Sequence, residues 1–205
     1  MPRLGLANTI TLVRMTFIPV FLVFLLGQFG NNPAWVEWRP WLAAAVFVVL
    51  AVTDVVDGYV ARTRNEVTTF GKFIDPLADK LLVTAALVGL VQLGNLPGWV
   101  AIIIIGRELI VSGLRMVAVA EGKVISASVY GKVKTVLQII ALVMFTIRRS
   151  PVIVEVVGQT GASYFVVLAW IVMSAALVMT IVSAADYFYR ARHVIAGPWS
   201  GGDTE

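Results

Sequence analysis

The sequence predicts an all-α integral membrane protein with six transmembrane helices. Of its 205 residues, 59% are hydrophobic and only 14% are charged, which is far from the balance of a soluble domain. The apolar residues gather in runs of about 20 residues or more, and each run is long enough to cross a hydrocarbon core of about 30 Å. These runs are residues 9–29, 41–61, 73–93, 99–120, 126–147 and 162–189.

The basic residues predict how these helices are oriented. One side of a six-helix layout collects Arg3, Arg62, Arg64, Lys72, Lys123, Lys132, Lys134, Arg190 and Arg192, and the other side has Arg39, Arg148 and Arg149. Because lysine and arginine are in excess on the cytoplasmic side of membrane proteins, both termini are expected in the cytoplasm. Residues 1–193 then form one membrane domain, and residues 194–205 are expected to be a disordered tail.

The composition also excludes several kinds of site. The chain has no cysteine, so a disulfide framework, a thiolate zinc site and a cysteine nucleophile are ruled out. Its net charge of +4 comes from residues at the ends of apolar runs rather than on one soluble face. This distribution favours an anionic membrane surface and phosphorylated substrates, and it argues against nucleic acid as a partner.

Four aspartates lie inside the second and third apolar runs. Asp54 and Asp57 are three residues apart and Asp75 and Asp79 are four apart, so each pair occupies one face of its helix. These side chains are too short to reach the membrane surface, and carboxylates at this density repel each other unless cations hold them. Carboxylates favour Mg²⁺ or Mn²⁺, and four can hold two ions about 3.5–4 Å apart. The pattern therefore predicts a metal site, and protonated or salt-bridged structural aspartates are the alternative.

Cationic side chains also occur within the apolar runs. Such groups are costly in a membrane, by at least about 2.5–3.5 kcal/mol each, so they usually face a polar interior. Most of the charged residues in these runs are expected in the cytoplasmic third of the membrane, and Arg107 and Glu108 are expected nearer its middle. Charged groups at that depth predict a water-filled cavity reaching inward. Arg62, next to the aspartate pairs, is suited to binding phosphate. The other cations of this group are Arg14, Arg107, Arg115, Lys132 and Lys134.

The residues around the aspartates resemble a known family. They reproduce the pattern D-x2-D-G-x2-A-R-x8-G-x3-D-x3-D, which is the signature of the CDP-alcohol phosphatidyltransferases, at Asp54, Asp57, Gly58, Ala61, Arg62, Gly71, Asp75 and Asp79. Residues 8–14, 70–82, 107–115 and 131–138 are similar to bacterial members that use glycerol 3-phosphate. Ala7 departs from the proline that is usual before the asparagine of the first helix.

This resemblance implies an enzyme of the bacterial cytoplasmic membrane whose active site faces the cytoplasm. It implies transfer of the phosphatidyl group of CDP-diacylglycerol to glycerol 3-phosphate, giving phosphatidylglycerophosphate and CMP. It also implies that the enzyme is a homodimer. Two ions, Mg²⁺ or Mn²⁺, would be held by the four aspartates, and Asp79 would be the catalytic base. The cytidine lipid would be bound by Gly58, Ala61, Arg62, Asn8, Thr11 and Thr68, and the acceptor phosphate by Arg14, Arg107, Arg115, Lys132 and Lys134.

Other functions remain open at this stage. The same chemistry with inositol phosphate, serine or phosphatidylglycerol as acceptor is the nearest alternative, although the number of cations favours a phosphorylated acceptor. Acidic residues inside membrane helices also mark ion pathways, so a cation transporter is a more distant alternative. The acidic cluster lies on one side of the membrane with no matching site across it, which argues against transport.

Overall fold

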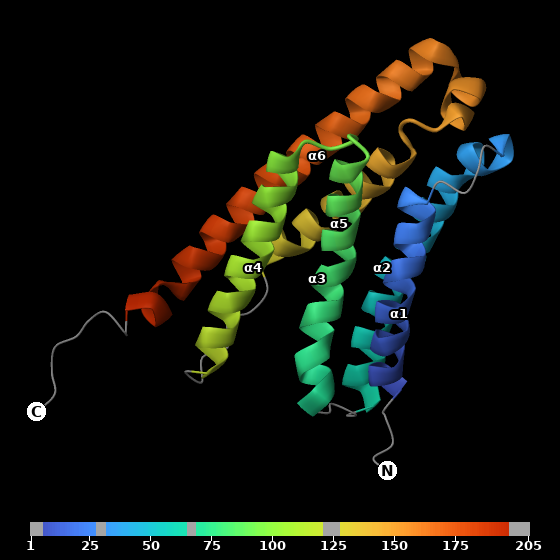
Figure 1. The fold of residues 1–205 in the computed structure, drawn as a ribbon. Helices are drawn as coiled ribbons and strands as arrows, with labels where there is room; N and C mark the ends of the chain where they lie inside the picture. Colours follow the sequence, from blue (N-terminus) through green and yellow to red (C-terminus); the bar gives the residue numbers. More distant parts are fainter. Residues whose placement is uncertain (1–5, 28–31, 65–68, 121–127, 197–205) are drawn as a thin grey trace, which may run out of the picture.

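The chain folds into six helices in the part that the structure describes. A computed structural model describes residues 6–27, 32–64, 69–120 and 128–196, and side chains within 11–27, 32–53, 78, 80–119 and 128–192. No strand occurs in these ranges. The helices are α1 (Leu6–Leu26), α2 (Pro33–Arg64), α3 (Thr69–Gln92), α4 (Gly98–Ala120), α5 (Val129–Ile147) and α6 (Pro151–Ala196) (Figure 1).

Two of these helices begin well before their apolar runs. The predicted starts were at Trp41 and Ala162, whereas α2 begins at Pro33 and α6 at Pro151. Proline is favoured at the first position of a helix because its fixed φ suits the helix and its missing N–H has no partner there. The helical run of α6 is interrupted at Gly158, whose φ of 70° and ψ of 174° lie outside the helical region. A positive φ is accessible to glycine without steric cost, so the break falls on this residue.

The helices pack around one apolar core. α1 contacts α2 and α3, α4 contacts α3 and α6, and α5 contacts α2 and α6. Aromatic pairs tie these contacts together, with ring centroids 5.6 Å apart for Phe21 and Phe47 and 5.0 Å apart, edge to face, for Phe145 and Trp170. Edge-to-face and tilted pairs at such distances add to the stabilisation from burial alone. The core therefore joins α1 to α2 and α5 to α6.

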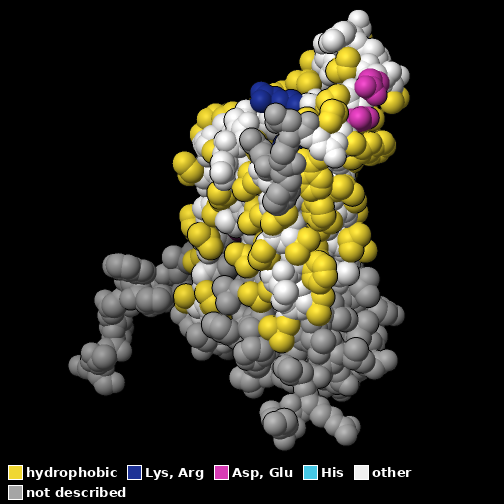
Figure 2. Space-filling view, turned by 45° about the vertical axis from the view of Figure 1, so that its right-hand side comes forward, with side chains coloured by type: hydrophobic (Ala, Val, Ile, Leu, Met, Phe, Trp, Pro, Cys, Tyr) yellow, Lys and Arg dark blue, Asp and Glu magenta, His cyan; other side chains and the backbone are white. Residues whose placement is uncertain are grey.

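Large apolar side chains also cover the outer surface. Figure 2 shows hydrophobic side chains over most of the described part of one face, with charged groups near its upper end. Exposure reaches 72% for Ile102 and 75% for Val156, which is unfavourable in water and favourable against lipid. Among the described residues, three segments are long and apolar enough to cross a membrane: Pro33–Thr53, Val129–Ile147 and Pro151–Arg192. The chain is a helical membrane protein.

Polar contacts close one end of the bundle. Arg39 Nη1 donates to the carbonyl of Gly27 at 2.9 Å, and Arg148 donates to the carbonyl of Asn95 in the α3–α4 connection. Trp41 Nε1 donates to Ser150 Oγ at 2.9 Å, which joins α2 to the α5–α6 connection. The starts of α1 and α3 and the ends of α2 and α4 lie at the opposite end (Figure 1). The basic residues near that opposite end are therefore separated from Arg39, Arg148 and Arg149.

Candidate functional site

The aspartate motif lies on two helices that pack against each other. The last part of α2 includes Asp54, Asp57, Gly58, Ala61 and Arg62, and the first part of α3 includes Gly71, Asp75 and Asp79. The backbone is helical at all of these positions, and their side chains lie outside the described residues. The same holds for Asn8 in α1, while Thr68 lies wholly outside the described residues.

Two neighbouring cavities lie beside the middle of α3. The first, named here the Arg115 cavity, has a volume of about 230 Å³ and is walled by α3, α4, α5 and α6. Its charged lining residues in the described part are Lys80, Arg107, Glu108, Arg115 and Lys132. Lys80 directly follows Asp79 of the motif. The Arg115 cavity thus adjoins the part of α3 that carries the motif.

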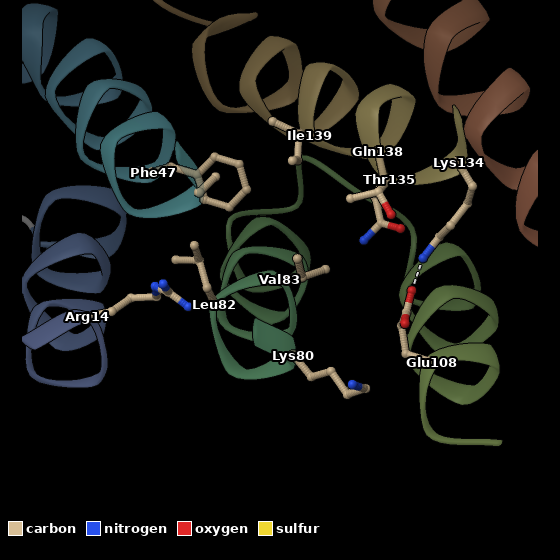
Figure 3. A pocket seen from close by; sticks show the side chains of 11 residues that line it. Arg14, Phe47, Lys80, Leu82, Val83, Glu108, Lys134, Thr135, Gln138 and Ile139 are labelled. Carbon is tan, nitrogen blue, oxygen red and sulfur yellow. Dashed lines mark ion pairs between the residues drawn. The ribbon is translucent and has the colours of Figure 1, made fainter. Parts of the chain in front are cut away.

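The second cavity, named here the Arg14 cavity, has a volume of about 120 Å³ and lies between α1, α2, α3, α4 and α5. Arg14 enters it from α1 and Lys134 from α5, and each residue is only 2% exposed (Figure 3). Phe47, Leu82 and Ile139 supply apolar walls. Burying a cation in an apolar bundle is costly unless it has hydrogen-bonding or charged partners. Arg14 and Lys134 therefore require such partners in this part of the fold.

Glu108 lies at the boundary between the two cavities. It lines both of them, as do Lys80 and Thr135. Its Oε1 forms an ion pair with Lys134 Nζ, drawn in Figure 3, and lies 3.5 Å from Arg107 Nη1. In the described part of the chain, Glu108 is the one carboxylate that lines either cavity. It therefore partly neutralises cations on α4 and α5.

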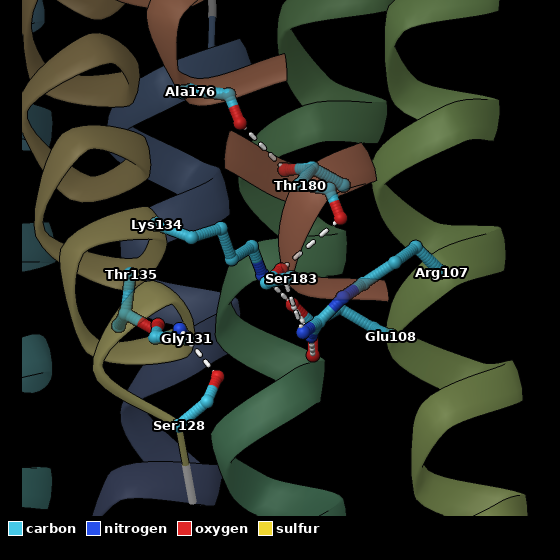
Figure 4. A network of polar contacts seen from close by, with 9 residues as sticks. All are labelled: Arg107, Glu108, Ser128, Gly131, Lys134, Thr135, Ala176, Thr180 and Ser183. Atoms are coloured by element: carbon cyan, nitrogen blue, oxygen red, sulfur yellow. Dashed lines mark hydrogen bonds and ion pairs between the residues drawn. The ribbon is translucent and has the colours of Figure 1, made fainter. Parts of the chain in front are cut away.

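A chain of hydrogen bonds fixes Arg107 against α6. Arg107 Nη2 donates to Ser183 Oγ at 2.9 Å, and Ser183 Oγ donates to the carbonyl of Thr180 at 3.1 Å (Figure 4). Thr180 Oγ1 in turn donates to the carbonyl of Ala176 at 2.7 Å. Thr180 and Ser183 are both fully or almost fully buried. Polar side chains of α6 thus hold the guanidinium of α4 in a defined orientation.

The start of α5 presents two further cations. Ser128 is the N-cap of this helix, and its Oγ accepts from the backbone N–H of Gly131 at 3.2 Å. A serine in this position satisfies a donor of the first turn and fixes where the helix begins. The next turn then carries Lys132, which is exposed and lines the Arg115 cavity, and Lys134, which is buried in the Arg14 cavity.

The structure brings the cations named from the sequence into two groups rather than one. Arg107, Arg115 and Lys132 line the Arg115 cavity, whereas Arg14 and Lys134 line the Arg14 cavity. Lys80 also lines the Arg115 cavity, and basic side chains at a cavity are suited to an anionic ligand. Sequence reasoning left out Lys80 and Ser183. The position of Lys80 beside Asp79 was a usable signal, but Ser183 lies in an apolar run and nothing in the sequence pairs it with Arg107.

Comparisons with known proteins identify the family to which the chain belongs. The model of the family described as CDP-alcohol phosphatidyltransferase matches residues 4–182. A Bacillus subtilis protein named CDP-diacylglycerol–glycerol-3-phosphate 3-phosphatidyltransferase is 44% identical over 191 residues, covering 91% of this chain and 94% of that protein. A Mycobacterium tuberculosis protein named probable phosphatidylglycerophosphate synthase is 40% identical over 193 residues, covering 94% of this chain and 84% of that protein. The chain belongs to the CDP-alcohol phosphatidyltransferase family.

Proposed function

We propose that this chain transfers the phosphatidyl group of CDP-diacylglycerol to glycerol 3-phosphate. The hydroxyl oxygen of the acceptor forms a bond to the lipid-side phosphorus, the bond from that phosphorus to CMP breaks, and phosphatidylglycerophosphate and CMP leave. The observation that carries the proposal is the Arg115 cavity, whose cations adjoin the helix with the motif aspartates. The name of the Bacillus subtilis relative includes the same two substrates, and that of the Mycobacterium tuberculosis relative includes the same product, which supports this choice of acceptor.

The donor set on α2 and α3 fits two divalent cations. Both helices are continuous through the motif and contact each other, so spacings of three and four residues put the two backbone positions of each aspartate pair on one face of its helix. Asp54, Asp57, Asp75 and Asp79 would hold two ions, Mg²⁺ or Mn²⁺. When bound, such ions neutralise the pyrophosphate and stabilise the negative charge on the departing CMP.

Asp79 is proposed as the base that takes the proton of the attacking hydroxyl. A hydroxyl is a weak nucleophile at neutral pH, so a carboxylate within hydrogen-bonding reach is needed. Lys80, the next residue, lines both cavities, which supports a position of Asp79 near the reacting end of the acceptor. Holding the attacking hydroxyl in line with the phosphorus accounts for much of what a phosphatidyl transfer requires of a protein.

The cytidine nucleotide is proposed to bind along the α1 and α2 side of the site. Gly58 and Ala61 have little or no side chain, which would allow a ligand to approach the helix closely. Arg62 would form charge-assisted hydrogen bonds to phosphate. Asn8, Thr11 and Thr68 are further candidates, and Thr11 is buried one turn before Arg14 on α1.

The acceptor phosphate is proposed to bind in the Arg115 cavity, to Arg107, Arg115 and Lys132. Arg107 is already oriented by Ser183, so less conformational entropy is lost when it binds an anion. Arg14 and Lys134, in the neighbouring cavity, would add positive charge near the reacting groups. An enzyme that used serine, which carries no phosphate, would have less need of these cations. Their presence therefore favours a phosphorylated acceptor.

In the membrane, residues 1–193 are proposed to form one six-span domain in a bacterial cytoplasmic membrane, with the site facing the cytoplasm. The separation of Arg39, Arg148 and Arg149 from the cations of the two cavities supports this orientation. A homodimer is proposed from the family resemblance, and analytical ultracentrifugation in detergent distinguishes it from a monomer.

The first prediction concerns acceptor and metal. Purified protein in mixed micelles with CDP-diacylglycerol and Mg²⁺ or Mn²⁺ is expected to release CMP with glycerol 3-phosphate, and EDTA is expected to abolish release until the metal is restored. Inositol phosphate, serine and phosphatidylglycerol serve as competing acceptors in the same assay. Release with one of these instead would overturn the acceptor, and metal-independent release would overturn the two-ion mechanism. No release with any acceptor would point back to transport.

The second prediction concerns the base. Asp79→Asn is expected to lower the transfer rate by about 10²–10⁴-fold, the usual contribution of general base catalysis, or more if metal is also lost. Asp186→Asn, on α6 and paired with Arg190, is the matched control and should retain near-normal turnover. Size-exclusion chromatography in detergent checks that both variants are folded. Normal turnover by a folded Asp79→Asn protein would remove this residue from the mechanism.

The third prediction concerns the acceptor phosphate. Arg115→Ala is expected to raise the KM for glycerol 3-phosphate by about 10-fold or more, since a hydrogen bond to a charged group contributes about 1.5–3 kcal/mol. The KM for CDP-diacylglycerol should change far less. Arg149→Ala, at the opposite end of the bundle, is the control. Equal changes in both KM values would contradict this role for Arg115.

The fourth prediction concerns orientation. The chain has no native cysteine, so a single introduced thiol reports its own accessibility. In right-side-out vesicles, a membrane-impermeant maleimide is expected to label Arg149→Cys at once and Arg192→Cys only after permeabilisation. The reverse pattern would invert the proposed topology.

A further inference from the structure

Glu108 has no part in the proposed chemistry so far, although it occupies a central place. It is the carboxylate that lines both the Arg14 cavity and the Arg115 cavity in the described part of the chain. Its side chain is 21% exposed, so it is sheltered but still accessible from a cavity. A carboxylate sheltered in this way is costly unless its charge has a partner, which raises the question of what else Glu108 binds.

The contacts of Glu108 leave room for a further hydrogen bond. An ionised carboxylate has about four acceptor positions on its two oxygens. Lys134 pairs with Oε1, and Arg107 Nη1 lies 3.5 Å from each oxygen, a long contact that is at the limit for a hydrogen bond. Oε2 therefore has a weak partner among the described residues and can accept a hydrogen bond from a ligand donor.

The position of Glu108 matches the middle of a three-carbon acceptor. Arg115 and Lys132 line only the first cavity, where the phosphate is proposed to bind, and Lys80, which follows Asp79 on α3, lines both cavities. In glycerol 3-phosphate the phosphate and the reacting hydroxyl are at opposite ends, and the carbon between them carries a free hydroxyl. Glu108 lies at the boundary between the two cavities, where that middle group would be.

We propose that Glu108 determines acceptor specificity by accepting a hydrogen bond from the free hydroxyl of the acceptor. The free hydroxyl of glycerol 3-phosphate donates a hydrogen bond to the Glu108 carboxylate. A substrate without this hydroxyl leaves a sheltered negative charge short of a hydrogen bond, and the free-energy cost of that loss discriminates between the two substrates. The negative charge of Glu108 also disfavours acceptors with an anionic group at the middle carbon. This inference rests on the proposed transfer to glycerol 3-phosphate.

A purely structural role for Glu108 predicts something different. If the carboxylate only held Lys134 and Arg107 in place, its loss would weaken every phosphorylated acceptor to the same extent. The readout must therefore compare two acceptors that differ only in the middle hydroxyl. Glycerol 3-phosphate and 3-hydroxypropyl phosphate are such a pair, since both have the phosphate and the reacting hydroxyl.

The experiment measures kcat/KM for these two acceptors with the native chain, Glu108→Gln, Glu108→Ala and Glu155→Gln. Glu155, on the exposed surface near the start of α6, provides the matched control. The native chain and the control are expected to prefer glycerol 3-phosphate by about 10-fold or more, as for a hydrogen bond to a charged group. The preference should fall to roughly fivefold or less in Glu108→Gln and close to one in Glu108→Ala.

The outcomes separate this inference from the function on which it rests. If the native chain uses glycerol 3-phosphate but its preference is unchanged in Glu108→Gln, or is already close to one in the native chain, the role of Glu108 is overturned and the proposed function stands. If the native chain uses neither acceptor, both fail. The KM for CDP-diacylglycerol and the elution volume in detergent check folding, and if Glu108→Ala does not fold, the isosteric Glu108→Gln variant decides.

Discussion

Neutralising positive charge inside an apolar helix bundle is the constraint on which the rest of this structure depends. Arg14, Arg107 and Lys134 are wholly or largely withdrawn from solvent, and each would be expelled from the bundle without partners. Glu108 and Ser183 meet part of this need, and in doing so they connect α4 to α5 and to α6. The helix packing and the polar interior therefore depend on each other, because removing Glu108 or Ser183 would leave a cationic side chain inside the bundle without that partner.

The same constraint explains why the two cavities lie where they do. Their polar lining extends from the middle of the bundle toward the end where α2 and α4 finish, whereas the other end is closed by arginines that donate to backbone carbonyls. A soluble phosphorylated acceptor can enter from one side while an acyl-chain substrate stays in the bilayer. A bundle with this asymmetry suits a reaction at the membrane surface better than passage through it.

Much of the helical framework could be predicted because a membrane helix needs a long apolar run, and six such runs are visible in the sequence. The starts of α2 and α6 could not be predicted, because polar residues or proline lower the hydrophobicity of segments that are still helical. These residues are Glu37, Arg39 and Pro40 in α2 and Glu155 and Gln159 in α6. The residues of the aspartate motif resemble the signature of the family, and the match of the family model confirms this resemblance. The division of the cations between two cavities depends on which helix faces which, and the contact of Arg107 with Ser183, 76 residues away, has no signature in local sequence.

The break at Gly158 has a consequence for how the protein fits its membrane. A straight helix of 46 residues would be about 70 Å long, more than twice the thickness of the hydrocarbon core. Turning residues 151–157 aside and tilting the rest of α6, as Figure 1 shows, shortens its projection along the bundle. Near the end of α6, Arg192 stacks on the ring of Tyr189, with its guanidinium 4.4 Å from the centroid. An aromatic and a cationic residue near the end of a membrane helix are typical of an interfacial anchor, so we expect lipid as well as protein to influence the depth of α6 in a bilayer and, with it, the depth of Ser183.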